Sequence, residues 1–258
     1  MKMLDRVGRA TQNFFEYAGG LTLLSAESAG FMVRLRIRLA ETVSQCYLLG
    51  VQSLIIVLLT SLFTGMVISL ESAQQAVQYG VGSLVGAAVA YASVRELGPM
   101  LTAVVVAGRV GAAIAAELGS MVVTEQIEAL RSLGLEPSRF LVVPRLTALL
   151  IMLPLLTIFA DVVSIGGGMW IAQTYAHISP DTFLSAAREA IGFGDVVKGL
   201  SKALVFACII AIVGAYQGLS TRGGAAGVGQ STTGSVVLAI ILIFISNFVM
   251  SFLLFGGQ

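Results

Sequence analysis

The stretch that decides the fold covers residues 42–70, TVSQCYLLGVQSLIIVLLTSLFTGMVISL, and it contains no charged residue. A helix needs roughly 20 apolar residues to cross a hydrocarbon core about 30 Å thick, so this stretch is long enough to span a membrane. A helix also satisfies its backbone hydrogen bonds internally, which lipid requires. The sequence therefore predicts a membrane-spanning helix here.

Four further apolar stretches predict four more spans. They cover residues 82–116, 146–176, 199–218 and 233–255. The composition agrees, because the 258 residues are 57% hydrophobic and 11% charged, with a mean hydropathy of +0.92. These values lie far from those of a soluble domain. We therefore expect an all-α integral membrane protein with one domain over residues 1–258.

Several function classes are disfavoured by the residues present. The net charge is only +1, without the basic excess typical of nucleic-acid binding. Cys46 and Cys208 lie in apolar runs and His177 is the only histidine, so we expect neither a disulfide framework nor a metal site. No serine–histidine–carboxylate set can be assembled, which disfavours a membrane enzyme. We expect no catalytic residues and no cofactor.

The distribution of basic residues predicts the orientation in the membrane. Lys and Arg in short flanking segments are retained on the cytoplasmic side. With the N-terminus inside, eleven basic residues are cytoplasmic and Arg188 alone lies on the other face. The eleven are Lys2, Arg6, Arg9, Arg34, Arg36, Arg38, Arg109, Arg131, Arg139, Arg145 and Arg222. Five spans then place the C-terminus outside.

The N-terminal segment, residues 1–41, is aromatic and apolar but basic at its end. Arg34, Arg36 and Arg38 alternate with apolar residues, which taken literally is a strand pattern. An isolated strand at a membrane surface would leave its edges unpaired, whereas a helix lets arginines reach the lipid head groups. We predict an interfacial helix that leads into the first span. A loosely ordered basic arm is the alternative.

Two short helices are expected between spans. Residues 124–133 read as an amphipathic cytoplasmic helix, with Ile127, Leu130 and Leu133 on one side and Gly134 as its stop. On the opposite face, a capping Ser179 followed by Pro180 predicts a helix over residues 180–191.

One segment resembles a nucleotide-binding motif without matching it. Residues 224–231, GAAGVGQS, fit the phosphate-binding loop pattern except that Gln230 replaces the lysine. That lysine supplies the charge for the phosphates, and the motif also needs a preceding strand. We interpret the segment as a flexible cytoplasmic turn, so any ATP must bind to another subunit.

Charged residues inside the apolar spans are the strongest functional signal. Arg95 and Glu96 lie in the second predicted span, and Asp161 lies in the third. Each costs about 2.5–3.5 kcal/mol near the bilayer centre, so each should face a partner or a cavity. Adjacent helical residues point about 100° apart, so Arg95 and Glu96 should have separate partners. Both a buried ion pair between helices and a polar point in a substrate cavity fit this pattern.

The second predicted span also has features of a bent, closely packed helix. Gly98-Pro99 should bend it, because proline lacks the amide donor. Small residues then recur every four positions and should allow another helix to pack closely. These are Ala103, Ala107, Gly111, Ala115 and Gly119.

The same region carries a family resemblance. The sequence RELGP at 95–99 is followed by AGRVGAA at 107–113, AELG at 116–119 and TEQIEAL at 124–130. This block closely resembles the MlaE/YrbE family of ABC-transporter permeases, and the likeness extends more weakly over the whole chain.

The resemblance implies a role in phospholipid transport for outer-membrane lipid homeostasis. It implies a homodimer in the bacterial inner membrane that binds a cytoplasmic ABC ATPase and a periplasmic Mce-domain protein. The ATPase contact would be the helix at 124–133, with Glu125 and Glu128 as polar contacts and Ile127 and Leu130 as apolar ones. The lipid cavity would contain Arg95 and Glu96, and its expected walls are Val67, Leu70 and Phe248.

Two other functions remain open. Glu96 or Asp161 could carry a proton or cation in a secondary transporter, because intramembrane acids often do so. However, the spans show no internal repeat. A membrane-embedded scaffold would need no cavity.

Overall fold

The computed structural model describes residues 2–33 and 38–256, and every regular element in these ranges is a helix. Of the N-terminal basic pattern, Arg34 and Arg36 lie outside the described residues. The α-helices are α1 (Lys2–Val33), α2 (Leu39–Gln45), α3 (Leu54–Gln78), α4 (Val85–Ala92), α5 (Gly98–Val106), α6 (Ala112–Val123), α7 (Gln126–Ser132), α8 (Val143–Ala176), α9 (Pro180–Ala190), α10 (Phe193–Leu219) and α11 (Gly224–Phe255).

Several α-helices join through π-helical or 3₁₀ turns into longer helices. Within the described residues five of these could cross a membrane, namely Leu39–Ala76, Gly82–Val123, Ser138–Ala176, Phe193–Leu219 and Gly224–Phe255. The expectation of an all-α membrane protein with five spans is therefore confirmed. The π-helical turns are Cys46–Gly50, Ser93–Leu97, Ala107–Gly111 and Ser138–Val142.

Most of these spans are longer than the apolar stretches in the sequence. The third begins at Ser138 rather than 146, and the fourth at Phe193 rather than 199. The second continues past 116 to Val123. The predicted spans end close to charged residues. A charged side chain does not end a helix, however, when it reaches water or an ion-pair partner.

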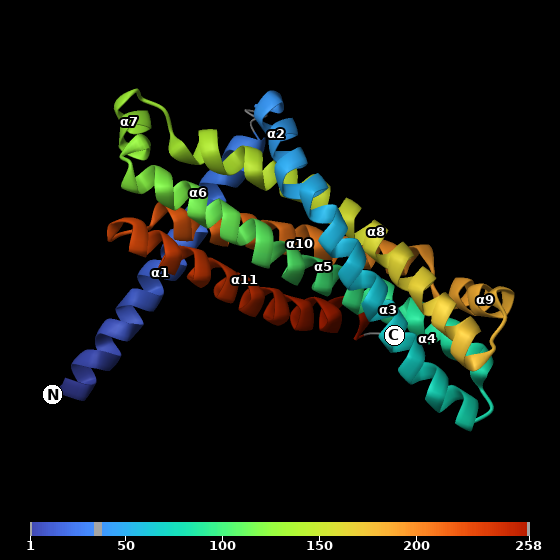
Figure 1. Ribbon diagram of the computed structural model, residues 1–258. Helices are drawn as coiled ribbons and strands as arrows, with labels where there is room; N and C mark the ends of the chain where they lie inside the picture. Colours follow the sequence, from blue (N-terminus) through green and yellow to red (C-terminus); the bar gives the residue numbers. More distant parts are fainter. Residues whose placement is uncertain (1, 34–37, 257–258) are drawn as a thin grey trace.

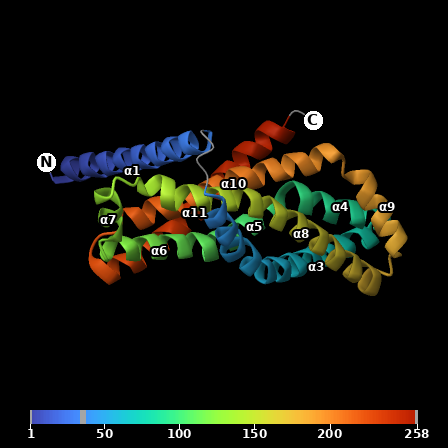
Figure 2. The ribbon, with the colours of Figure 1, turned by 90° about the horizontal axis from the view of Figure 1, so that it is seen from above.

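The helices form an elongated bundle. Helix α7 lies at one end and α9 at the other, as both views show (Figures 1 and 2). Helices α3 and α8 make the most extensive contact, and α10 packs on α5, α6, α8 and α11. Helix α9 covers α4, with Phe183 fully buried between them.

The contact between α3 and α8 depends on glycine. A Cβ atom on Gly65 would collide with the backbone of Ser164 in α8, so the two backbones meet at this point. One turn later, the Ser69 hydroxyl donates to the Gly168 carbonyl at 2.7 Å. Small residues at such crossings are typical of packed membrane helices.

The predicted ridge of small residues in the second span is a packing surface. All five positions are buried, and α10 and α11 lie against them. Gly214 approaches the Gly111 carbonyl, and the Ser235 hydroxyl donates to that same carbonyl at 3.2 Å. The expectation of close helix packing along this ridge is confirmed.

Helix α1 is separate from the span that follows it. Helix α1 is described up to Val33, and the backbone of Arg38 is extended (φ −91°, ψ 94°) just before α2 begins at Leu39, so the helix expected over residues 1–41 does not lead unbroken into α2. Its later part packs on α10, where the rings of Tyr17 and Tyr216 meet edge to face. Burial there raises the pKa of Tyr17 to about 12, so the phenol stays neutral. The beginning of α1 extends away from the other helices (Figure 1).

The short helix α7 differs from its predicted range of 124–133. Helix α6 runs on to Val123, and Glu125 has a left-handed backbone (φ 60°) that reverses the chain before Gln126. Leu133, expected on the buried side, is 75% exposed because it lies past the last helical turn. Gly134 (φ 73°) ends the helix as predicted. Its amide donates to the Arg131 carbonyl, and the Leu135 amide donates to the Leu130 carbonyl.

Two further loop predictions have different outcomes. Helix α9 begins as expected, with Pro180 in its first turn and the Ser179 hydroxyl accepting from the Thr182 amide at 3.2 Å. The interpretation of residues 224–231 as a flexible turn is wrong, because this segment forms the first turns of α11. The non-helical connection is residues 220–223. Gly223 and Gly224 have positive φ angles, which are readily accessible to glycine.

Candidate functional site

A cluster of charged and polar side chains joins the second, fourth and fifth spans. It starts at the π-helical turn Ser93–Leu97, which carries Arg95 and Glu96. Pro99 has no amide hydrogen, so the Arg95 carbonyl lacks its usual donor four residues later. The Lys202 ammonium of α10 donates to this carbonyl at 2.8 Å. A side chain of another helix thus replaces the missing backbone bond.

Glu96 is held by donors from two helices. Its Oε1 accepts from Lys202 Nζ and from the Ser251 hydroxyl, both at 2.8 Å. Its Oε2 accepts from Asn247 Nδ2 at 2.9 Å. Asn247 and Ser251 lie one turn apart on α11, so Glu96 fastens the second span to both α10 and α11.

Lys202 is the centre of the cluster. Its side chain has no exposed surface, and it also donates to the Ser251 hydroxyl at 2.7 Å. The close approach of α10 makes this possible, because Gly199 lies against the Val94 carbonyl and has no side chain to separate the helices. A buried ammonium is tolerated because all its donors are used and a carboxylate is adjacent.

Arg95 is bound on several sides. Its Nε and Nη2 donate to Asp195 Oδ1 at 2.8 and 2.6 Å, and its Nη1 donates to the Tyr91 hydroxyl. The rings of Tyr91 and Phe255 lie 4.1 and 4.4 Å from the guanidinium carbon. Asp195 is fixed in turn by the Gly192 amide at 2.9 Å. The guanidinium therefore has a set orientation.

The expectation that Arg95 and Glu96 have separate partners is confirmed. Arg95 pairs with Asp195 and Glu96 pairs with Lys202, so both ion pairs connect the second span to α10. Lys198 also belongs to the cluster, since its Nζ lies 4.9 Å from the Phe255 ring. The cluster therefore has three cations and only two carboxylates, Glu96 and Asp195. This net positive charge favours an anionic group.

The other expected substrate-binding residues lie apart from these contacts. Val67 is on α3 and is 53% exposed, whereas Leu70 on the same helix is partly buried. Phe248 is on α11 and is 74% exposed. It follows Asn247, whose amide reaches Glu96, so its ring points about 100° away from the cluster.

Several residues of the cluster were not identified from the sequence. They are Tyr91, Asp195, Lys202, Asn247, Ser251 and Phe255. Lys202 could have been identified from the sequence, because a lysine inside an apolar run needs a partner. Asn247 and Ser251 could have been identified as a pair, since two polar residues four positions apart share one face of a helix.

The residues expected to contact an ATPase lie on or beside α7. Ile127 is buried against the rest of the protein, and Leu130 is partly buried. Glu125 and Glu128 are exposed. The two carboxylates are thus accessible to a partner, and the apolar residues mainly hold the helix in place.

Comparison with known proteins identifies the family. A family model described as Permease MlaE matches residues 42–253 of this chain. The chain belongs to the MlaE permease family. The match covers nearly all of the five spans, the cluster except Phe255, and α7, so these elements lie within the part shared with other MlaE permeases.

Individual relatives agree with this family. A probable ABC transporter permease protein of Synechocystis is 45% identical over 86% of this chain and 84% of its own length. A probable ABC transporter permease protein of Rickettsia felis is 35% identical over 99% of this chain and 98% of its own length. The chloroplastic protein TRIGALACTOSYLDIACYLGLYCEROL 1 of Arabidopsis thaliana is 38% identical over 86% of this chain and 63% of its own length. The chain is therefore a multi-pass ABC-transporter permease of the MlaE type.

Proposed function

We propose that this permease moves phospholipid between the bacterial inner membrane and a periplasmic Mce-domain partner, and so serves outer-membrane lipid homeostasis. The observation that carries the proposal is the net positive charge of the cluster, in which Lys198 adds a third cation to the two ion pairs Arg95–Asp195 and Lys202–Glu96. A phospholipid needs both a charged contact for its phosphate and apolar surface for its chains. Arginine and lysine are the side chains that proteins commonly use to bind phosphate.

A relative supports the choice of lipid as substrate. The name of the Arabidopsis protein contains that of a galactosyl diacylglycerol, which is a membrane lipid. The exposed apolar residues Val67 and Phe248 could contact acyl chains. In the proposed homodimer, Val67, Leu70 and Phe248 of two copies line a central cavity next to Arg95 and Glu96.

The proposed assembly places α7 in the cytoplasm. A cytoplasmic ABC ATPase binds there through Glu125, Glu128, Ile127 and Leu130, and it hydrolyses the ATP. The Mce-domain protein binds at the end that carries α9. Accordingly, the N-terminus is cytoplasmic and the C-terminus periplasmic.

Asp161 supports a second candidate function, proton-coupled transport. Its Oδ1 is buried without a hydrogen-bond partner among the described residues, and it faces Gly98 beside the bend of the second span. Glu96 is poorly suited to this task, because three donors already hold its carboxylate. The similarity to ABC-transporter permeases makes ATP the better supported energy source.

Purification of the tagged chain from its native membrane in mild detergent tests the proposal. We expect an ABC ATPase, an Mce-domain protein and phospholipid to co-purify, and native mass spectrometry should find two copies of the permease. A folded chain that retains none of these partners would contradict the proposal. In that case a proton gradient should be tested as the energy source with an Asp161→Asn variant.

Charge reversal at α7 tests the contact with the ATPase. In a reconstituted complex, replacing Glu125 and Glu128 by lysine should lower lipid transfer about ten-fold, the equivalent of about 1.4 kcal/mol. ATP hydrolysis should continue, because the change affects only the exposed contact. Lipid transfer and hydrolysis are measured in the same vesicles.

The control reverses Glu16, which is exposed on α1 and belongs to neither proposed partner contact. Its replacement by lysine should leave the ratio of lipid transfer to hydrolysis unchanged. Equal ratios in the α7 variant and in the control would contradict a role for α7 in coupling.

A further inference from the structure

Arg109 differs from three other cations of the spans, which form ion pairs. Arg95 pairs with Asp195, Lys202 with Glu96, and Arg145 with Glu117, each within 2.8 Å. Arg109 donates instead to three neutral acceptors of the first span: the Ser53 hydroxyl at 2.6 Å, Gln52 Oε1 at 3.0 Å and the Leu48 carbonyl at 3.5 Å. Among the described residues, no carboxylate lies within ion-pair distance of it.

An uncompensated arginine in a span is costly. Charged side chains within spans normally pair with one another, with backbone carbonyls or with water in a cavity. The neutral acceptors orient the guanidinium of Arg109 but do not neutralise its charge. The site is therefore suited to an anion that arrives from outside the chain.

A cavity lies beside this arginine. Its volume is about 220 Å³, and it lies between the first and second spans. Its polar lining is Gln45, Gln52, Arg109 and Glu117, and its apolar lining is Leu48, Leu49, Val110 and Ala113. Polar and apolar groups thus face the same space, which matches an amphiphilic ligand.

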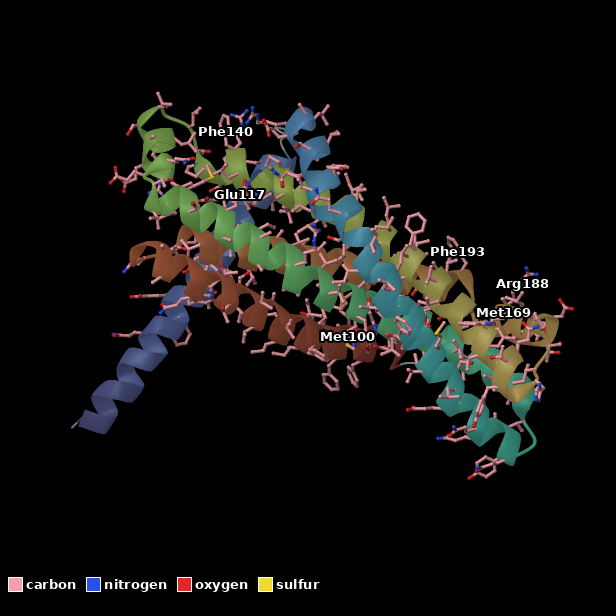
Figure 3. The ribbon with its side chains drawn as sticks, viewed as in Figure 1. Met100, Glu117, Phe140, Met169, Arg188 and Phe193 are labelled. Atoms are coloured by element: carbon pink, nitrogen blue, oxygen red, sulfur yellow. The ribbon has the colours of Figure 1, made fainter. Side chains whose placement is uncertain are left out.

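A second cavity, of about 290 Å³, adjoins the first toward α7. Both are lined by Gln45 and Glu117. The second cavity also contains Arg38, Arg145 and Phe140, and Figure 3 shows Glu117 and Phe140 close to the α7 end of the bundle. The two cavities thus share part of their lining between the α7 end and Arg109.

We propose that the cavity at Arg109 binds the phosphate group of a membrane phospholipid, with an acyl chain against Leu48 and Ala113. Arg95 and Arg109 are separated by about 20 Å along the helix axis, so this is a second site. The proposal concerns binding alone. It does not depend on the proposed transport, partners or direction, and either can fail without the other.

Photo-cross-linking tests the site in the full chain. A photoreactive amino acid replaces Leu48, which is 43% exposed and lines the cavity, or Leu59, which is 49% exposed on α3 and serves as the reference. The protein is reconstituted in vesicles of phosphatidylethanolamine and alkyne-tagged phosphatidylglycerol. Arg109→Gln should reduce the lipid adduct at position 48 about ten-fold, a change of about 1.4 kcal/mol, and leave that at position 59 unchanged.

A cavity-filling variant separates binding from folding. Ala113 is exposed and lines the cavity, so Ala113→Phe should block the adduct at position 48 while Arg109 keeps its hydrogen bonds. Ser120→Phe, at another exposed position of α6, is the matched control and should have no effect.

Two results would overturn the proposal. One is an adduct at position 48 that persists in both Arg109→Gln and Ala113→Phe. The other is an equal loss of the adducts at positions 48 and 59 in Arg109→Gln, which would show a general defect rather than the loss of a head-group site.

Discussion

Replacing Lys202 by methionine should lower the free energy of unfolding by about 3 kcal/mol or more, because it leaves Glu96 without its cation. The Arg95 carbonyl would also lose its donor at the proline bend. Methionine has a similar length and fits the apolar surroundings, so the loss reports the charge rather than a void. Unfolding is followed by helical circular dichroism during titration with a denaturing detergent.

Two variants make this result specific. Lys198→Met removes a cation from the same helix that has no short contact with Glu96, so it should cost much less. The double change Glu96→Gln and Lys202→Met removes both charges and should recover part of the stability, since a neutral pair needs no counter-charge. A double variant as unstable as Lys202→Met alone would rule out the ion pair as the cause.

A valine at Gly65 should separate α3 from α8 and prevent normal folding. The new Cβ would occupy the space of the Ser164 backbone, which cannot move aside as a flexible side chain could. Overpacking commonly costs about 1–3 kcal/mol, and we expect at least the upper value here because the obstacle is backbone. The yield of monodisperse protein and its thermal unfolding in detergent measure the effect.

Gly166 provides the matched control for this substitution. It lies on α8 close to the same crossing, but a Cβ there meets no atom within 4 Å. Gly166→Val introduces the same side chain with the same loss of backbone freedom and should leave folding nearly unchanged. Equal losses at both positions would show that helix propensity, not the crossing, causes the defect.

The spans could be predicted from the sequence because they depend on local composition. Five apolar stretches gave the five spans, and the spacing of Ala103, Ala107 and Gly111 identified a packing surface. The ends of the spans were less predictable. Residues such as Glu117 and Asp195 continue a helix because their charges are paired or reach the surface, and this depends on the tertiary structure.

The candidate site could be predicted only in part. Arg95 and Glu96 stand out because they are charged residues in an apolar stretch. Their partners Asp195, Lys202 and Asn247 lie at least 100 positions further along the chain. A single sequence does not reveal which helices become neighbours, so the pairing became visible only in the structure.

The bond from Lys202 to the Arg95 carbonyl has a consequence for how the chain can change during evolution. Pro99 creates the need for an external donor, and Lys202 meets it from another helix. Pro99 is therefore better tolerated while Lys202 is present. A lineage that lost the proline would regain the backbone bond and leave Lys202 with one acceptor fewer. Positions 99 and 202 should therefore covary among homologues.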